Sequence, residues 1–256
     1  MNSIKELISR YDHLKTQRDN WNSHYQELAD YMLPRKADVV KSRSKGDKRM
    51  ELIFDGTALQ AVDLLSSSLH GLLTSGAAPW FHLDMKEEDL GREDDVREWL
   101  QDTSQRMLRA FDQSNFGTEV HEMYVDLVVF GTGCMFVEME EDALRFSTRH
   151  ISEFYIQENQ FGMVDTVFRS YKSPVRQVVQ RFGIENVTDY IFKKHQDKPD
   201  EEIEILHVVI PREDRDKTKV DNKNMPFASI YIDMQSSAML SESGFQEFPY
   251  IVPRFL

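Results

Sequence analysis

Cysteine is almost absent from this sequence of 256 residues, where Cys134 is the single one. One cysteine excludes an internal disulfide and any zinc site built from several thiolates. No segment approaches the roughly 18 consecutive apolar residues of a membrane span, and Met1–Glu6 lacks the basic-then-apolar layout of a secretory signal. We therefore expect synthesis in a reducing cytoplasm and no membrane partner.

Positive charge is outnumbered by negative charge. The chain has 31 Lys and Arg against 44 Asp and Glu, a formal net charge of -13. General adhesion to nucleic acid needs clustered cations, so the overall balance argues against it, although it suits a protein past which DNA slides without sticking.

The exception is a basic segment between residues 35 and 49. It has an excess of five positive charges, because only Asp38 and Asp47 oppose Arg35, Lys36, Lys41, Arg43, Lys45, Lys48 and Arg49. Without apolar periodicity, the segment is typical of an exposed loop. Two interpretations stay open: a solvated, mobile loop, or a contact to DNA or to an acidic partner surface.

Catalytic motifs are missing as well. Gly131-Thr132-Gly133 lacks the third glycine and the preceding strand of a dinucleotide loop, and His121-Glu122 lacks the second histidine of a zinc protease. A cluster of acidic residues is expected at a hairpin tip and consists of Glu138, Glu140, Glu141 and Asp142. We interpret this cluster as a solvated turn, and the alternative is a weak cation site. We therefore predict no catalytic, metal or cofactor site, and a structural protein rather than an enzyme.

The sequence begins with a long helix. Ser3 and Glu6 form a capping-box pattern, apolar residues then recur at helical spacing, and Pro34 ends the helix. At ~1.5 Å per residue it spans roughly 45 Å, which suits a helix that braces a second domain or a neighbouring subunit. Its candidate interface residues are Trp21, Tyr25 and Tyr31, and the alternative is that they pack within their own subunit.

Three more helices are expected in the first half. One runs from Asp55 or Thr57, as N-cap, to Gly76, and its leucines and small residues predict burial on most sides. The other two begin near residues 93 and 116, and we expect them to form an antiparallel helical hairpin that ends at Gly131.

From Cys134, expected to be a small buried hydrophobe, the pattern changes to a period of two. It predicts a hairpin, several further strands and one short inserted helix with Ser173 and Pro174 at its start and Gly183 at its end; the strand ranges are 134–139, 144–148, 154–157, 164–171, 203–210, 227–234 and 248–255. The predicted fold class is α+β: long N-terminal helices followed by a mainly antiparallel sheet with an inserted helix. We expect a helical part, 1–133, and a β-rich part, 134–256.

The last residues, Phe248–Leu256, are apolar and extended. Because domain termini are usually polar and exposed, we expect this chain to be the N-terminal part of a longer protein.

Six segments together resemble the portal proteins, or head-to-tail connectors, of short-tailed tailed phages. They are YQELADYMLPR (25–35), IFDGTA (53–58), LLTSGAAPWF (72–81), FGTG (130–133), VDTVFR (164–169) and FPYIVPRF (248–255). Each is weak alone, but six in the same order along almost the whole chain make a specific match.

The resemblance implies a structural subunit of a ring of about twelve copies at one capsid vertex, through which double-stranded DNA is packaged and ejected. This chain would be the wing, with stem, clip and crown beyond residue 256. Implied partners are copies of itself, capsid, scaffold and tail proteins, the packaging motor and the passing DNA, in a virion assembled from protein made in the host cytoplasm. The alternative is another oligomeric virion scaffold or adaptor without enzymatic activity.

Overall fold

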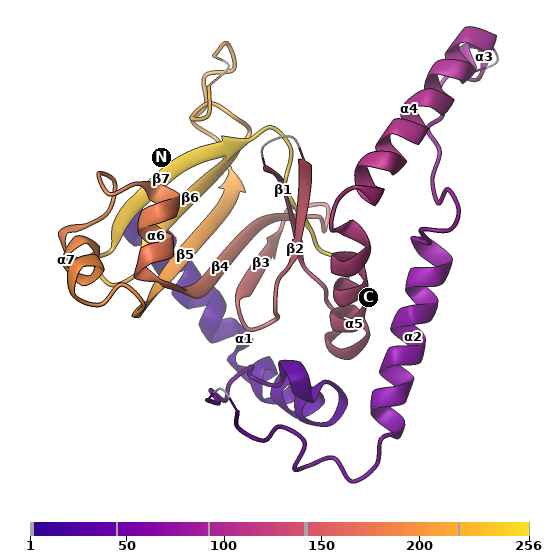
Figure 1. The fold of residues 1–256 in the computed structure, drawn as a ribbon. Helices are drawn as coiled ribbons and strands as arrows, with labels where there is room; N and C mark the ends of the chain where they lie inside the picture. Colours follow the sequence, from indigo (N-terminus) through magenta and orange to yellow (C-terminus); the bar gives the residue numbers. More distant parts are fainter. Residues whose placement is uncertain (1–2, 45, 92, 141–142, 220, 256) are drawn as a thin grey trace. The chain divides into compact units, whose positions relative to one another are not determined.

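The computed structural model describes residues 3–44, 46–91, 93–140, 143–219 and 221–255. Helices come first and strands dominate after residue 134, so the predicted α+β class is confirmed (Figure 1). The first half contains α1 (Ile4–Met32), η1 (Pro34–Lys36), α2 (Thr57–Leu73), α3 (Glu88–Gly91), α4 (Asp94–Asp112) and α5 (Phe116–Phe130). The second half contains β1 (Met135–Glu140), β2 (Ala143–Thr148), β3 (Phe154–Glu158), β4 (Val164–Pro174), α6 (Val175–Phe182), α7 (Asp189–Asp197), β5 (Glu202–Pro211), β6 (Phe227–Asp233), β7 (Ala238–Phe245) and β8 (Tyr250–Ile251).

The chain divides into two compact units. The first combines Met1–Ser23 with Ser152–Pro249, and the second combines His24–Ile151 with Tyr250–Leu256. The start of α1 packs with the later strands, while β1 and β2 pack with α5, and α1 contributes residues to both units. The division into a helical part, 1–133, and a β-rich part, 134–256, stays a prediction.

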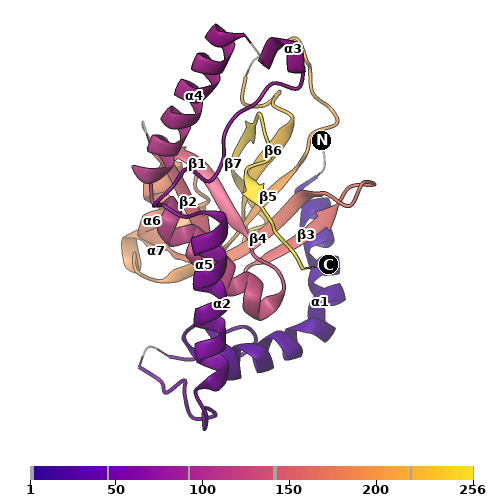
Figure 2. The same cartoon turned by 90° about the vertical axis from the view of Figure 1, so that its right-hand side faces the viewer.

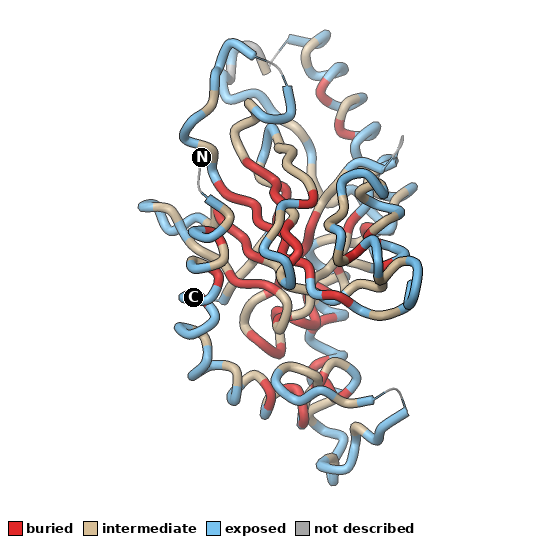
Figure 3. The backbone as a smooth tube through the Cα atoms, turned by 90° about the vertical axis from the view of Figure 1, so that its left-hand side faces the viewer, coloured by how far each residue is buried: buried red, intermediate tan, exposed pale blue. Residues whose placement is uncertain are grey.

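The first unit is built on a five-stranded antiparallel sheet in the order β3-β4-β5-β6-β7. Side chains alternate between the two faces of a strand, so neighbouring residues of β5 join different cores. Leu206 lies in the core with Leu7 and Tyr11 of α1, whereas Ile205 lies in the core with Val178 of α6. Figures 1 and 2 show α1 on one face of this sheet and α6 and α7 on the other, and Figure 3 shows the buried middle of the strands in red.

The second unit is built around α5, which is buried along most of its length. Val120 and Tyr124 pack with Met135 and Phe146 of the hairpin β1–β2, and β8 adds a third strand beside β1. Cys134 is fully buried, as predicted.

Local signals predicted most helix ends correctly. At the start of α1, Ser3 N–H donates to Glu6 Oε2 at 2.7 Å and Glu6 N–H donates to Ser3 Oγ at 3.3 Å, so the capping box is confirmed. The left-handed Gly131, with φ 71°, ends α5 as predicted. The inserted helix begins one residue later than expected: Pro174 is its N-cap, because Ser173 still pairs with Ile203 in the sheet.

The prediction that the helix after Asp55 is buried on most sides was wrong. Val62 and Ser66 are buried in α2, but Leu64 and Leu72 are 72% and 83% exposed. The physical reason is that α2 packs along one side, mainly against α5. The helix also ends at Leu73 rather than Gly76, and its N-cap is Gly56.

The predicted helical hairpin was also wrong. Figure 1 shows α5 continuing onward from α4 after the turn at residues 113–115, and the helix that lies antiparallel beside α5 is α2. Both partners were expected as helices, but spacing along the chain did not indicate which helix would fold back on which.

Four elements were not anticipated: η1, α3, α7 and β7. α7 is capped by Thr188, whose Oγ1 accepts from Ile191 N–H at 3.4 Å. β7 is an edge strand of the five-stranded sheet and contains no β-branched residue, so the usual strand signal is missing. The expected final strand is shorter than predicted, with β8 at Tyr250–Ile251 and an isolated bridge between Thr132 and Arg254.

Within the described ranges, the helices lack the combination of length and apolarity that crossing a membrane requires.

Candidate functional site

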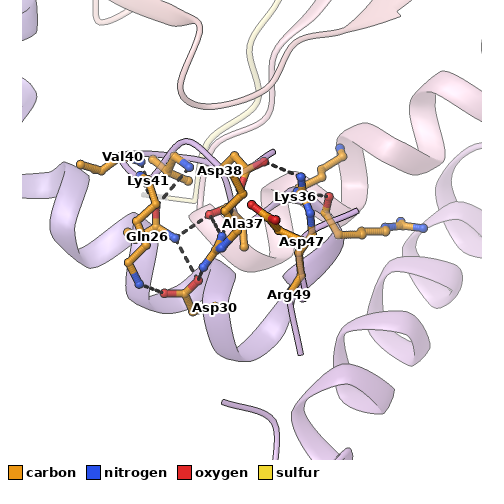
Figure 4. A network of polar contacts seen from close by, with 12 residues as sticks. Gln26, Asp30, Lys36, Ala37, Asp38, Val40, Lys41, Asp47 and Arg49 are labelled. Atoms are coloured by element: carbon orange, nitrogen blue, oxygen red, sulfur yellow. Dashed lines mark hydrogen bonds and ion pairs between the residues drawn. The ribbon is translucent and has the colours of Figure 1, made fainter. Parts of the chain in front are cut away.

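The basic segment is organised by one buried amide from α1. Gln26 is only 6% exposed, and its Oε1 accepts the backbone N–H groups of Val39, Val40 and Lys41 at 3.2, 2.9 and 3.0 Å. Its Nε2 donates to Ala37 O at 2.5 Å and to Asp30 Oδ1 at 3.0 Å (Figure 4). All these groups are backbone or buried, so Gln26 fixes the path of the chain just after η1.

Asp30 lies one helical turn beyond Gln26 and receives two cations of the segment. Lys41 Nζ is 2.7 Å from its Oδ2 and Arg43 Nη2 is 2.8 Å from its Oδ1. Burial by itself raises the pKa of Asp30, but the hydrogen bonds from Lys41 and Arg43 outweigh burial and hold the pKa below its ordinary value. The same contacts raise the pKa of Arg43.

A second carboxylate of the segment, Asp38, is also paired. Arg43 Nη1 lies 3.1 Å from its Oδ1, and Arg49 Nη2 lies 2.7 Å from its Oδ2. Arg43 therefore bridges Asp30 and Asp38, and it also donates to Ala37 O at 2.9 Å. These contacts link both ends of the segment to its own backbone and to α1.

The start of the segment is tied to α5. Lys36 Nζ lies 2.8 Å from Asp126 Oδ1 and 3.0 Å from Glu122 Oε2, and Arg35 Nη2 lies 3.1 Å from Glu122 Oε1. His150 Nε2–H donates to Lys36 O at 2.8 Å. Burial raises the pKa of Asp126 to about 6, in spite of the nearby Lys36.

These ion pairs change the charge that the segment presents. Counting Asp30, Glu122 and Asp126 with Asp38 and Asp47, seven cations face five carboxylates, so the excess falls from five to two. Lys48 is exposed, and Lys45 lies outside the described residues. The sequence indicated the cations but not their partners, because Glu122 and Asp126 belong to a helix more than eighty positions away. A possible DNA or partner contact by these residues stays a prediction.

The three candidate interface aromatics have different environments. Trp21 is 58% exposed and Tyr31 is 47% exposed, whereas Tyr25 is half-buried and packs edge-to-face with Phe130 at a ring distance of 5.9 Å. Trp21 and Tyr31 therefore offer accessible aromatic surface, and a role of any of the three in a subunit interface stays a prediction.

The first unit carries a polar cavity of about 570 Å³. Its lining mixes guanidinium and carboxylate groups: Arg10, Glu158, Asp165, Arg212, Glu213, Asp214 and Glu242. Arg212 Nη1 is held 3.0 Å from Glu242 Oε1, and Arg10 Nη2 donates to Gln157 at 2.7 Å. The arrangement does not define a particular reaction.

The acidic turn after β1 shows no metal-site geometry in its described part. Glu140 Oε2 lies 2.7 Å from Arg145 Nη1, while Glu141 and Asp142 lie outside the described residues. Among the residues that the structure covers, no group of three or more His, Cys, Asp or Glu is placed to hold a metal ion.

The family match and two similar proteins point to the same protein family. Residues 4–256 match the family described as bacteriophage head to tail connecting protein. The portal protein of Salmonella phage epsilon15 is 34% identical over 256 residues, which cover 98% of this chain and 46% of that protein. The probable portal protein of Bordetella phage BPP-1 is 32% identical over 256 residues, with the same coverage of 98% and 46%.

This chain therefore belongs to the bacteriophage head to tail connecting protein family, and the resemblance inferred from the six segments is confirmed. The chain spans about half the length of the curated relatives that it matches.

Proposed function

We propose that this chain is the wing portion of a subunit of a phage portal ring, a structural assembly at one capsid vertex through which double-stranded DNA is packaged and ejected. The observation that carries the proposal is the family match along residues 4–256, together with two relatives named as portal or probable portal proteins. About twelve copies would close the ring, because heterologous contacts repeated at a fixed rotation generate a closed assembly.

The net negative charge of the chain supports a role in a channel that lets DNA pass without binding it tightly. The chain has a net charge of -13, and ion pairs reduce the excess of its most basic segment to two. Few cations remain to bind phosphates, and binding strength rises with the number of phosphates neutralised. We propose that any DNA contact of this chain is weak and independent of sequence.

The proposed role is structural, without catalysis by this chain. The proposed partners are neighbouring subunits, capsid, scaffold and tail proteins, the packaging motor and the passing DNA, and the proposed location is the portal vertex of the virion. These proposals are supported by the membership of this chain in the family of bacteriophage head to tail connecting proteins.

Imaging of the complete gene product tests this proposal. Purified protein should form closed rings of uniform diameter with a central channel in electron micrographs, and mass photometry should give a mass near twelve subunits. Open filaments, compact dimers or monomers at every concentration would contradict the portal assignment and would favour a different virion scaffold or adaptor.

A further inference from the structure

The helix α2 exposes an apolar face that the described chain leaves uncovered. Its covered side contains Val62 and Ser66, which are buried, and Leu69, which packs with the core around α5. On another side, Leu64, Leu65 and Leu72 are 72%, 48% and 83% exposed. A helix that is apolar on several sides is normally buried on several sides, so its exposed leucines are a candidate contact surface.

We define the outer face of α2 as Ala61, Leu64, Leu65, Ser68 and Leu72. These residues recur three or four positions apart, which places them along one side of the helix. The segment that leads into α2 also has exposed apolar side chains, since Met50 and Phe54 are 60% and 93% exposed. Isolated apolar residues are common on protein surfaces, but a periodic set on one helix is not explained in that way.

Charge narrows the choice of what covers this face. Asp63 is the one formally charged residue of α2, while the whole chain carries -13. DNA is a poor candidate, since the outer face offers no cation to a phosphate. Two copies of the same acidic chain repel each other in general, so they can approach closely only where their surfaces are nearly uncharged. The outer face of α2 meets that requirement.

We propose that a second copy of this chain covers the outer face of α2. The inference rests on the proposed ring, which gives every subunit a neighbour on each side. In a closed ring larger than a dimer the contact is heterologous, so the outer face of α2 meets a different surface of the neighbouring copy. Leucines alternating with Ala61 and Ser68 leave notches into which side chains of that surface can pack.

Cross-linking between isotopically distinct copies tests the identity of the occupant. Cys134 is fully buried, so Leu72→Cys provides an accessible thiol to which a photoreactive benzophenone can be attached. Light and ¹⁵N-labelled versions of the complete gene product are mixed before assembly, illuminated and digested. The proposal expects cross-linked peptide pairs that join a light and a heavy chain, whereas pairs confined to chains of one isotope would overturn it.

A charge placed on the outer face tests its energetic role. Leu65→Glu should weaken association by about tenfold or more, since the contact would then bury a carboxylate that has no partner. Ser67→Glu is the matched control: it adds the same charge at an exposed position of α2 beside the polar Asp63, and it should leave association unchanged. Circular dichroism confirms that each variant is folded. Equal association of Leu65→Glu and the wild-type protein would overturn the proposal.

The two experiments separate this inference from the portal assignment. Closed rings without mixed-isotope cross-links would refute the role of α2 and leave the portal assignment intact. Mixed-isotope cross-links in an assembly that is not a ring would support the role of α2 and contradict the portal assignment.

Discussion

Lys36 Nζ lies 2.8 Å from Asp126 Oδ1, while Asp126 Oδ2 is buried without a hydrogen-bond partner among the described residues. A single ion pair leaves one oxygen of this carboxylate unsolvated, and burial raises its pKa to about 6 from an ordinary value of 3.8. We therefore expect the contact between Lys36 and Asp126, which anchors the basic segment, to depend on pH.

The first prediction concerns this dependence. Between the two pKa values the folded protein binds more protons than the unfolded chain, so the contribution of Asp126 to stability falls as pH rises. We predict that the unfolding free energy of the wild type minus that of Asp126→Asn falls by about 2 kcal/mol from about pH 4 to about pH 7. Urea unfolding across this range measures it.

Glu122 provides a control of opposite sign for that experiment. Burial raises the pKa of Glu122, but the hydrogen bond from Lys36 together with the positive charges of Lys36 and Arg35 outweighs burial, so the net pKa is lowered. The difference between the wild type and Glu122→Gln should therefore rise with pH through the acidic range. A wild-type to Asp126→Asn difference that stays constant with pH would contradict the raised pKa.

The second prediction concerns Gln26. Gln26→Ala removes the acceptor of three backbone N–H groups that are only partly buried, so each should cost less than the roughly 1–3 kcal/mol of a fully buried unsatisfied group. The segment should open more often, so trypsin should cleave after Lys41, Arg43, Lys48 or Arg49 faster than in the wild type. Gln17→Ala on the same helix, at an exposed position, is the matched control and should leave the cleavage rate unchanged.

The third prediction contrasts two glycines after α5. Gly131 has φ 71° and open space where a Cβ would lie, so Gly131→Ala should cost about 1–2 kcal/mol from backbone strain. A Cβ on Gly133 would lie 2.8 Å from Met123 Cγ and 3.0 Å from Met123 O, so Gly133→Ala should cost more. Gly71→Ala within α2 meets no atom and should be neutral or stabilising. Thermal unfolding of the three variants gives the order, and equal costs at Gly131 and Gly133 would contradict it.

The sequence indicated local structure better than packing partners. The Ser3–Glu6 capping box and the alternating pattern after Cys134 depend on neighbouring residues, and both appear in the structure. The exposure of Leu64 and Leu72 was not predictable in the same way. An apolar helix indicates that something covers it, but not whether the cover belongs to the same chain.

The candidate site shows the same limit. The run of Lys and Arg after Pro34 was visible in the sequence, whereas the buried amide of Gln26 resembles any polar residue of a surface helix. Asp126 lies on a different helix, so its pairing with Lys36 depends on the tertiary fold. The segment that the sequence predicts as an exposed basic loop therefore has charges that are largely matched within the chain.

The fourth prediction concerns DNA. If any binding occurs, neutralising Lys41, Arg43, Lys45 and Lys48 should lower affinity equally for all DNA sequences and flatten its salt dependence. With an excess of two charges, the logarithm of the wild-type binding constant should fall against the logarithm of salt with a slope of about -2 or less steep. Fluorescence anisotropy with unrelated duplexes measures both quantities.

A matched control for the DNA experiment neutralises four exposed lysines elsewhere: Lys5, Lys15, Lys193 and Lys217. This variant has the same net charge as the test variant, so a loss confined to the test variant assigns binding to the basic segment. Because Lys41 and Arg43 pair with Asp30, circular dichroism must first show that the test variant is folded. Base-specific binding that survives all four changes would refute the prediction.

The fifth prediction concerns assembly through α1. Trp21 is 58% exposed, so removing its ring should leave the fold of one subunit intact. Truncating a buried aromatic residue at the centre of an interface can cost ~2 kcal/mol or more of association free energy. Trp21→Ala in the complete gene product should reduce the fraction of protein in rings, most clearly at low concentration, while the circular dichroism spectrum stays unchanged.

Trp99→Ala is the control, because Trp99 is a tryptophan of similar exposure, 62%, on α4. Normal rings from Trp21→Ala would remove Trp21 from the interface, and equal losses from both variants would show a general effect of removing exposed tryptophan. If Trp21 and the outer face of α2 belong to separate contacts, the effects of Trp21→Ala and Leu65→Glu on association should add, and mass photometry of the double variant measures this directly.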